Sequence, residues 1–384
     1  MAGVRLREDA DYLVPAMSPR DNREPVDVKA EHLVAAPNLL RDVLKVGPIS
    51  GVCMDSMHDL DLGVFTQYID CVWKSSTPAK REELEARMAL VKRYQPTEFQ
   101  RRVRPLGDRN KWKATEFKNF ILYYGYSVFS GIVSDDEFTN FKRLSFAVRI
   151  LMRKDMEYVW DSAARPLVKN FLQAFEAMHT RARLSMKMHR LSHLVDNCHR
   201  FGPLYKHCAY PFEGFIHFLK TLCHSPILPA QQIFNRTMEL WQFRQDHGVL
   251  EPQPREFKVF RKAGVVEKVR FKGITYGLDD KDAYFAHQDP KDKEPRYYKI
   301  IDIIAPGESA KHVQFTAKKL AITENYADPC NSGLLGIFTW PANEFEEELF
   351  VRKISDFSFK VCVLPINSDL TVFVALPMSD ILEN

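Results

Sequence analysis

Asp55 and His58 are the first side chains in this 384-residue sequence whose types and spacing could do chemistry. They lie three residues apart in GVCMDSMHDLDLG, at the start of a predicted helix, so they share one helix face. As an acid and an imidazole they are candidate catalytic residues. The alternative is that Asp55 caps the helix by accepting hydrogen bonds from free backbone amides, and that His58 is an ordinary first-turn residue. The residues by themselves favour this capping role.

A second segment, residues 189–217, concentrates histidine and cysteine. Its members are His189, His193, Cys198, His199, His207, Cys208 and His217. The first two histidines are one helical turn apart, a spacing that zinc ligands use, but no second pair has a recognisable ligand spacing. We therefore predict no metal site from these residues. Glu213, which follows Pro211, is a further candidate acid, although the helix macrodipole also favours a carboxylate in a first turn.

Helices must position most of these residues. From Leu60 to Trp241, apolar side chains recur at steps of three and four, as in Val64, Tyr68 and Val72. After EPQPREF the pattern changes to short β-branched and aromatic runs, which are VVEKVRF, YYKIIDII, GLLGIFTW, FKVCVL and TVFVAL. The sequence therefore predicts an α+β protein, with a helix-rich body followed by a small β-rich domain.

These patterns divide the chain into three parts. We assign a lead-in segment to residues 1–50, a helix-rich region to 51–247 and a β-rich C-terminal domain to 257–384. Within the last part, the charged insert GLDDKDAYFAHQDPKDKEPR is predicted to be a long solvated loop.

Composition limits the class of protein. A hydrophobic fraction of 45% is enough to bury a core, yet no run of about 18 apolar residues could span a membrane, and the start carries acids where a signal peptide is apolar. Seven cysteines without a C-x-x-C pair favour a reducing compartment. The sequence thus indicates a protein that is neither secreted nor embedded in a membrane. Its net charge of +4 is too small to indicate nucleic-acid binding by itself.

Basic residues are concentrated in the connector QRRVRPLGDRNKWK. The candidates for contacting nucleic acid are Arg101, Arg102, Arg104, Arg109, Lys111 and Lys113. Such side chains neutralise phosphates, and the interleaved Phe99 and Trp112 could stack on exposed bases. The alternative is a solvated charged surface, which is what most charge runs are.

Five segments together carry a resemblance to a known family. In order they are DSMHDLDLGV, PTEFQRRVRPL, WKATEFKNFILYYG, HRLSHLVDNCHRFGPL and YPFEGFIHFLK. Their types and order resemble the CACTA (En/Spm-like) transposases and proteins derived from them, over about residues 31–241. The β-rich end, with FVALP, is similar to the region that follows in those proteins.

The resemblance implies part of an RNase H-like, DDE-type nuclease fold interrupted by a helical insertion. In such an enzyme three acidic residues hold two divalent cations, for which Mg²⁺ is suited, and these assist in-line attack on phosphate. Asp55 and His58 match the D-x-x-H motif of the family, and Glu213 matches its late acidic residue. The resemblance also makes DNA a partner and the nucleus the expected location, with the cytoplasm as the alternative.

The sequence departs from the family upstream of Asp55. Two catalytic aspartates are expected there on strands, whereas Asp9, Asp11, Asp21, Asp27 and Asp42 lie in no apolar strand pattern. We therefore expect a transposon-derived protein that is catalytically incomplete alone and binds DNA without sequence preference. It would need no cofactor alone, but Mg²⁺ if the nuclease site is completed by further residues. Homo-oligomers or other transposase-derived chains are the candidate protein partners.

Three alternatives remain open from the sequence. The chain could be a non-catalytic module in which the His-rich helices and the β-rich domain bind a protein. It could be a structural protein stabilised by zinc. It could also be a truncated gene model of an active transposase.

Overall fold

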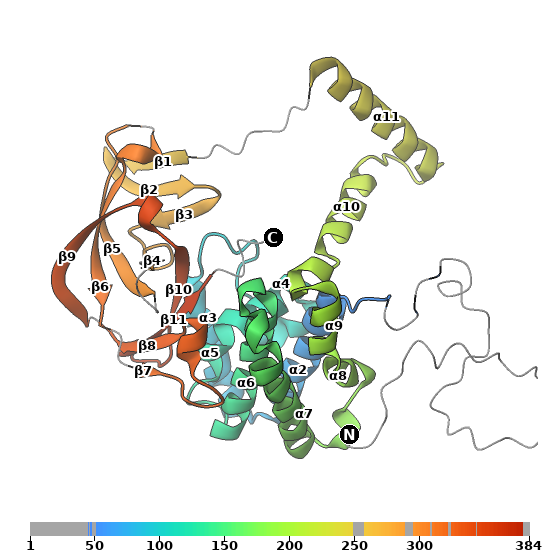
Figure 1. Cartoon of the computed structure of the whole chain (residues 1–384), viewed down its shortest axis with the longest axis horizontal. Coiled ribbons are helices and arrows are strands. Elements are labelled where there is room, and N and C mark those ends of the chain that lie inside the picture. Colours follow the sequence, from blue (N-terminus) through green and yellow to red (C-terminus); the bar gives the residue numbers. More distant parts are fainter. Residues whose placement is uncertain are drawn as a thin grey trace, which may run out of the picture.

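The structure, a computed structural model, describes residues 45, 47, 51–248, 257–288, 295–307, 309–321, 324–342 and 344–378. A helical body is followed by antiparallel sheets, which confirms the predicted α+β class (Figure 1). The predicted lead-in segment lies outside the described residues except for Lys45 and Gly47, and so do the upstream aspartates. No described helix is long and apolar enough to cross a membrane.

The helical half of the described chain contains one π-helix, ten α-helices and the turns that connect them, and all but the last two α-helices form the body. They are the π-helix η3 (Met57–Phe65) and the α-helices α2 (Thr66–Ser75), α3 (Pro78–Tyr94), α4 (Ala114–Asn119), α5 (Gly125–Phe129), α6 (Asp135–Met152), α7 (Arg165–His179), α8 (Met186–Leu191), α9 (Leu194–Phe201), α10 (Tyr210–Thr221) and α11 (Pro229–His247). The connecting 3-10 and π turns are η4 (Leu106–Lys111), η5 (Phe120–Tyr124), η6 (Lys154–Val159), η7 (Trp160–Ala164), η8 (Arg181–Arg183) and η9 (Leu204–His207).

Local sequence explains where the long helices begin. Thr77 precedes Pro78 at the start of α3, and its hydroxyl accepts a hydrogen bond from the Lys80 amide (3.4 Å). Ser134 caps α6 in the same way, accepting from the Glu137 amide (3.2 Å). Such side-chain caps satisfy amides that have no partner within the helix. Most of α6 is buried, so this helix forms the centre of the body.

The second half of the chain forms two sheets. Their strands are β1 (Phe257–Lys262), β2 (Val265–Phe271), β3 (Ile274–Gly277), β4 (Tyr284–His287), β5 (Arg296–Ile304), β6 (Gln314–Leu320), β7 (Glu324–Asn325), β8 (Phe338–Pro341), β9 (Phe345–Lys353), β10 (Phe359–Pro365) and β11 (Val372–Pro377). The order is β1-β2-β3 in one sheet and β7-β8-β11-β10-β4-β5-β6-β9 in the other, with antiparallel pairing between neighbours.

The insert predicted as a long solvated loop contains β4, which pairs with both β10 and β5 inside the larger sheet. Tyr284, Phe285 and Ala286 of this strand are buried. The loop prediction is therefore wrong for these residues. The physical reason is that four residues suffice for a strand whose two faces are both covered, and so short a run carries no alternating pattern.

The body and the larger sheet share one hydrophobic core. Side chains from the sheet region, including Ile337, Leu364 and Leu376, belong to the same buried cluster as Phe141 and Leu151 of α6. Two smaller clusters lie within the sheets themselves. Burial of apolar surface, worth roughly 25 cal/mol per Å², therefore holds the sheet against the helices as well as each part to itself.

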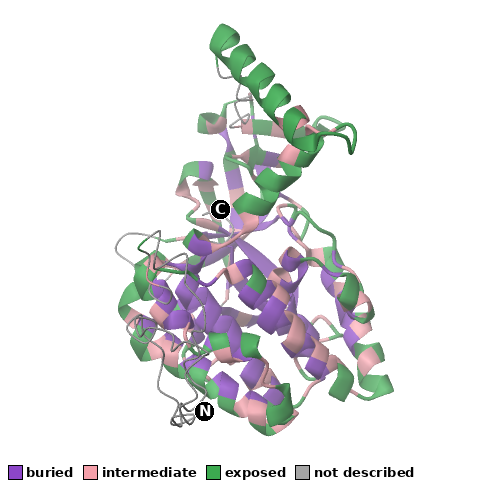
Figure 2. Ribbon diagram, turned by 90° about the vertical axis from the view of Figure 1, so that its right-hand side faces the viewer, coloured by how far each residue is buried: buried purple, intermediate pink, exposed green. Residues whose placement is uncertain are grey.

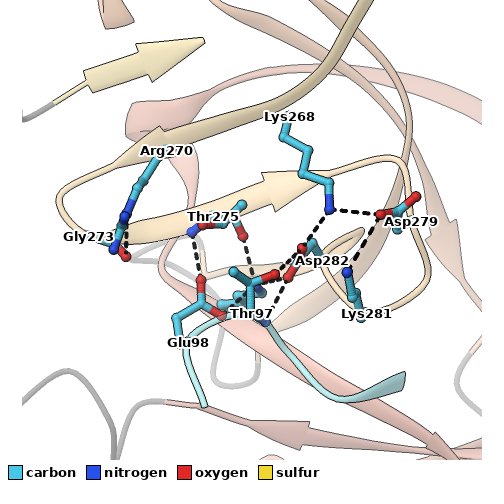
Figure 3. A network of polar contacts seen from close by, with 10 residues as sticks. Thr97, Glu98, Lys268, Arg270, Gly273, Thr275, Asp279, Lys281 and Asp282 are labelled. Atoms are coloured by element: carbon cyan, nitrogen blue, oxygen red, sulfur yellow. Dashed lines mark hydrogen bonds and ion pairs between the residues drawn. The ribbon is translucent and has the colours of Figure 1, made fainter. Parts of the chain in front are cut away.

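A buried ionic network also joins the body to both sheets (Figure 3). The Lys360 ammonium of β10 lies 2.6 Å from Glu98 and 2.7 Å from Asp282, and it donates to the Thr275 carbonyl of β3 at 2.7 Å. Thr97 donates to Asp282 through its hydroxyl (2.6 Å) and its amide (3.1 Å). Burial alone would raise the pKa of Asp282, but the Lys360 ammonium and these hydrogen bonds hold it below its usual value.

We predict that Lys360→Met lowers the free energy of unfolding by about 3–5 kcal/mol. Methionine keeps the volume of the stem but leaves Glu98 without its cation, and it leaves the buried Asp282 with Lys268 alone, 3.3 Å away. Urea unfolding measures the effect. The matched control is Lys154→Ala, since Lys154 is an exposed lysine paired with Glu157, and a change below about 1 kcal/mol is expected. Equal effects of the two substitutions would contradict the network's role.

Candidate functional site

Two segments far apart in sequence meet at the start of η3, and they carry the first and last motifs of the predicted site. The Asp55 carboxylate accepts hydrogen bonds from the amide of Met57 (3.0 Å) and from the amide of Ala209 (2.8 Å), both at Oδ1. It therefore closes the first turn of η3 and also fixes the residue that precedes α10. We call this meeting of residues 54–61 with residues 204–210 the junction.

Three further contacts hold the junction together. The Ser56 hydroxyl donates to the Leu204 carbonyl (3.1 Å), and the Tyr210 hydroxyl donates to Asp61 Oδ2 (2.6 Å). His207 is buried, with Nδ1 2.8 Å from the Met54 carbonyl oxygen, so this ring nitrogen is the donor. The motifs that suggested a nuclease are thus adjacent, and they are joined by hydrogen bonds.

His58 contacts Asp55. Its Nδ1 bonds to Asp55 Oδ2, and the His58 side chain is about half exposed (52%). Both oxygens of Asp55 therefore have partners within the junction. Asp55 and His58 thus lie on one face, as their spacing predicts. Asp55 also accepts from a free amide at the start of η3, as the capping alternative expects, although the N-cap residue itself is Ser56.

Glu213 lies apart from this pair. It is on the first turn of α10 with its side chain exposed, and this side chain makes no hydrogen bond or ion pair with any described residue. Among the described residues, no three His, Cys, Asp or Glu side chains gather in a way that could hold a metal ion. Asp55, His58 and Glu213 therefore do not fit a Mg²⁺ site as they stand, because such a site needs several free oxygens around one point.

Two acids of the same motif, Asp59 and Asp61, are buried and were not predicted as functional. Arg190 of α8 lies 2.9 Å from Asp59, although burial still raises the pKa of Asp59. Burial raises the pKa of Asp61 to about 7, while the Lys118 ammonium and the Tyr210 hydroxyl act in the opposite direction. Asp61 lines a small pocket with Lys118, Tyr210 and others.

Close packing explains why Gly63 lies in the middle of η3. A Cβ atom at this position would be 2.9 Å from the His58 carbonyl oxygen and 3.0 Å from Cδ of Lys187. A larger residue would clash with the His58 carbonyl of η3 and displace the Lys187 side chain, which donates from Nζ to the Leu62 carbonyl at 3.2 Å. The glycine thus allows the wide π-helical turn and its neighbour to fit together.

The His- and Cys-rich segment is spread over several elements. His189 and His193 are close, with their Nε2 atoms 3.4 Å apart, and burial and His189 together lower the pKa of His193. Cys198 is buried, with Sγ 4.0 Å from His207 Nε2. No zinc-like set forms within the part of the chain that the structure describes.

The basic connector separates into paired and free cations. Arg104 makes two bonds to Glu116, at 2.6 and 2.5 Å, and Arg109 bonds Asp70 at 2.6 and 3.1 Å. Lys111 forms an exposed pair with Asp108 (2.8 Å). The other candidates, Arg101, Arg102 and Lys113, are exposed and have no side-chain partner among the described residues.

Trp112 of the connector and Phe99, which directly precedes the connector, are not available for stacking on bases. Trp112 is buried and donates from Nε1 to the Pro105 carbonyl (3.1 Å), and Phe99 is buried against Tyr123 and Tyr124. The idea that they contact nucleic acid is therefore wrong. Both belong to the core of the body.

Comparisons with known proteins add no relative. No family model matches the chain, and no curated protein and no solved structure is detectably similar to it.

The burial of Asp61 predicts a distinctive pH dependence. The pKa of Asp61 rises from 3.8 in the unfolded chain to about 7 in the folded one, so the folded state binds the proton more tightly. The resulting stability is fully present below about pH 4 and is lost as the pH rises through about 7. We compare the unfolding free energy of the wild type with that of Asp61→Asn. From pH 4 to pH 8, the wild-type value should fall relative to that of the variant by on the order of 3 kcal/mol.

Urea unfolding of both proteins across this pH range measures the difference. Tyr210→Phe serves as the control, because the loss of its hydrogen bond should raise the pKa of Asp61 further and move the dependence to higher pH. A difference that does not change with pH would contradict the assignment.

Proposed function

We propose that this chain is a transposon-derived protein that binds DNA through surface charge and neither cuts nor joins DNA on its own. The ordered motifs that resemble CACTA transposases support the origin. The observation that carries the proposal is the use of Asp55, since both of its oxygens already serve partners within the junction.

The chemistry of phosphoryl transfer explains why the occupied oxygens of Asp55 argue against catalysis. Two-metal catalysis needs carboxylates that converge on cations about 4 Å apart and keep oxygens free to bind them. Here Asp55 serves as a cap, and Glu213 is exposed on α10 without a contact to Asp55 or His58. Completion of such a site would require further acidic residues from outside the described part of this chain.

The geometry of the connector supports DNA as a partner. Arg104 joins its two halves, because Nη2 donates to the Lys111 carbonyl (2.6 Å) while the same guanidinium bonds Glu116 at the start of α4. This clamp holds the run 101–104 beside the run 111–113. The free cations Arg101, Arg102 and Lys113 then lie on neighbouring stretches, and we call these three the connector patch.

A patch of this kind binds phosphates and does not recognise the base sequence. Arg and Lys that neutralise phosphates release counterions, which gives affinity that falls steeply with salt. With Trp112 and Phe99 buried, no aromatic side chain of the connector adds base stacking. We therefore propose non-specific binding to duplex DNA, in keeping with a role in the nucleus.

We predict that replacing Arg101, Arg102 and Lys113 together by Ala weakens DNA binding and lowers the slope of log K against log salt by about 3, roughly one per lost phosphate contact. Fluorescence anisotropy with a labelled duplex at several salt concentrations measures both quantities. The clamp residue Arg104 is kept, so the fold of the connector is preserved.

The control removes the same charge from separate places. Lys169, Lys262 and Lys311 are exposed on α7, β1 and a turn before β6, and their joint replacement by Ala should change the slope much less. Equal losses in the two variants would show that net charge, and not the connector patch, drives binding. Cleavage of the duplex by the wild-type chain with Mg²⁺ or Mn²⁺ would refute the non-catalytic part of the proposal.

A further inference from the structure

The helices α10 and α11 form an arm that carries a large exposed apolar surface. Neither helix contains a buried residue, and both project away from the body (Figure 2). The exposed large apolar side chains of the arm are Phe212, Phe215, Ile216, Phe218, Ile227, Leu228, Phe234, Met238, Leu240, Trp241 and Phe243. Isolated apolar residues on a surface need no explanation, but eleven of them on two successive helices and the turn between them do.

The exposed area is as large as a protein interface. Phe212 is 71% exposed, Phe234 64% and Trp241 53%. With side chains of this size, the arm exposes on the order of 1,000 Å² of apolar surface, which exceeds the roughly 800 Å² that each partner buries in a standard interface. Monomeric proteins rarely leave this much uncovered, so a partner of similar extent is required.

The arm has a fixed shape. Gln232 at the start of α11 ties down the turn that follows α10, accepting from the amides of His224 (2.9 Å) and Ser225 (3.4 Å) and donating to the Ser225 carbonyl (3.1 Å) and to the Ile227 carbonyl. The base of α10 is held to the body through the bonds of Ala209 to Asp55 and of Tyr210 to Asp61. A surface ordered in advance loses little entropy on binding.

The charges of the arm argue for a second copy as the occupant. Glu213, Glu239 and Asp246 balance Lys220, Arg236 and Arg244, so the two helices together are neutral. A neutral surface gains nothing from phosphates, which makes DNA or an anionic membrane a poor partner. It can meet an identical surface across a two-fold axis without repulsion, as an isologous dimer requires.

The exposed edge of the larger sheet is the main competitor for such a contact. Strand β9 lies at this edge and exposes Leu349 and Val351. It also carries a run of charged residues, Glu346, Glu347 and Glu348, with Arg352 and Lys353 at its other end. Charged residues on an edge strand oppose pairing between sheets, so the arm is the better self-contact.

We infer that the chain forms a homodimer through its α10–α11 arms, which pack against each other around a two-fold axis. The partner is a second copy of this chain, and the contact is formed by the apolar side chains of both helices. This inference does not depend on DNA binding, because it rests on the arm alone.

Sedimentation velocity of the full chain tests the inference. At micromolar concentration, the molar mass obtained for the wild type should be twice the 44.6 kDa of one chain. The triple variant Phe215→Ser, Phe234→Ser, Trp241→Ser should dimerise ~100-fold more weakly or not at all, because large aromatic anchors dominate interface energies. The control variant Tyr158→Ser, Leu349→Ser, Val351→Ser removes three exposed apolar side chains elsewhere and should remain dimeric.

A second measurement covers the case in which a variant misfolds. Hydrogen exchange of the wild type at low and high concentration should show protection that grows with concentration in residues 210–221 and 229–247. A wild-type chain that stays monomeric overturns the inference and leaves the arm to a different partner. A dimer that survives the arm variant, or that is lost only in the control variant, also overturns it.

Discussion

The carboxylate of Asp55 is the constraint on which the account depends. One of its oxygens accepts from the amide that opens η3 and from the amide that precedes α10, and the other contacts His58. Because a carboxylate is a strong acceptor for backbone amides, this single side chain fixes two chain segments that are 154 residues apart. The direction in which the arm leaves the body follows from this bond and from its neighbour between Asp61 and Tyr210.

The contacts between the body and the sheets determine which surfaces stay exposed and can bind partners. Between the body and the sheets, apolar side chains are buried in the shared core and ionic groups are paired in the Lys360 network. Within the described part of the chain, the connector exposes cations that no acid neutralises, and the arm exposes apolar side chains that no other helix covers. We propose that the first surface binds phosphates and that the second binds another copy of the chain.

Sequence patterns predicted what is local and failed where partners are distant. The α+β order and five of the eleven described strands (β2, β5, β8, β10 and β11) could be predicted, and VVEKVRF coincides with β2. Strand β4 was missed because YFAH lies in a charged insert, and its burial depends on β5 and β10. Arg104 and Arg109 looked like phosphate ligands because spacing does not show that Glu116 and Asp70 approach them. Asp61 was overlooked, although its apolar neighbours in MHDLDLGVF were a signal of burial.

The unfolding free energy of Asp55→Ala, measured without metal, tests the central claim most directly. A carboxylate kept for binding cations is repelled by nearby acids such as Asp59, so its removal should leave the metal-free protein as stable or more stable. A carboxylate that caps two segments has the opposite effect, and its loss leaves the amides of Met57 and Ala209 without an acceptor. We predict a loss of about 1–3 kcal/mol. Unchanged or increased stability would contradict the account.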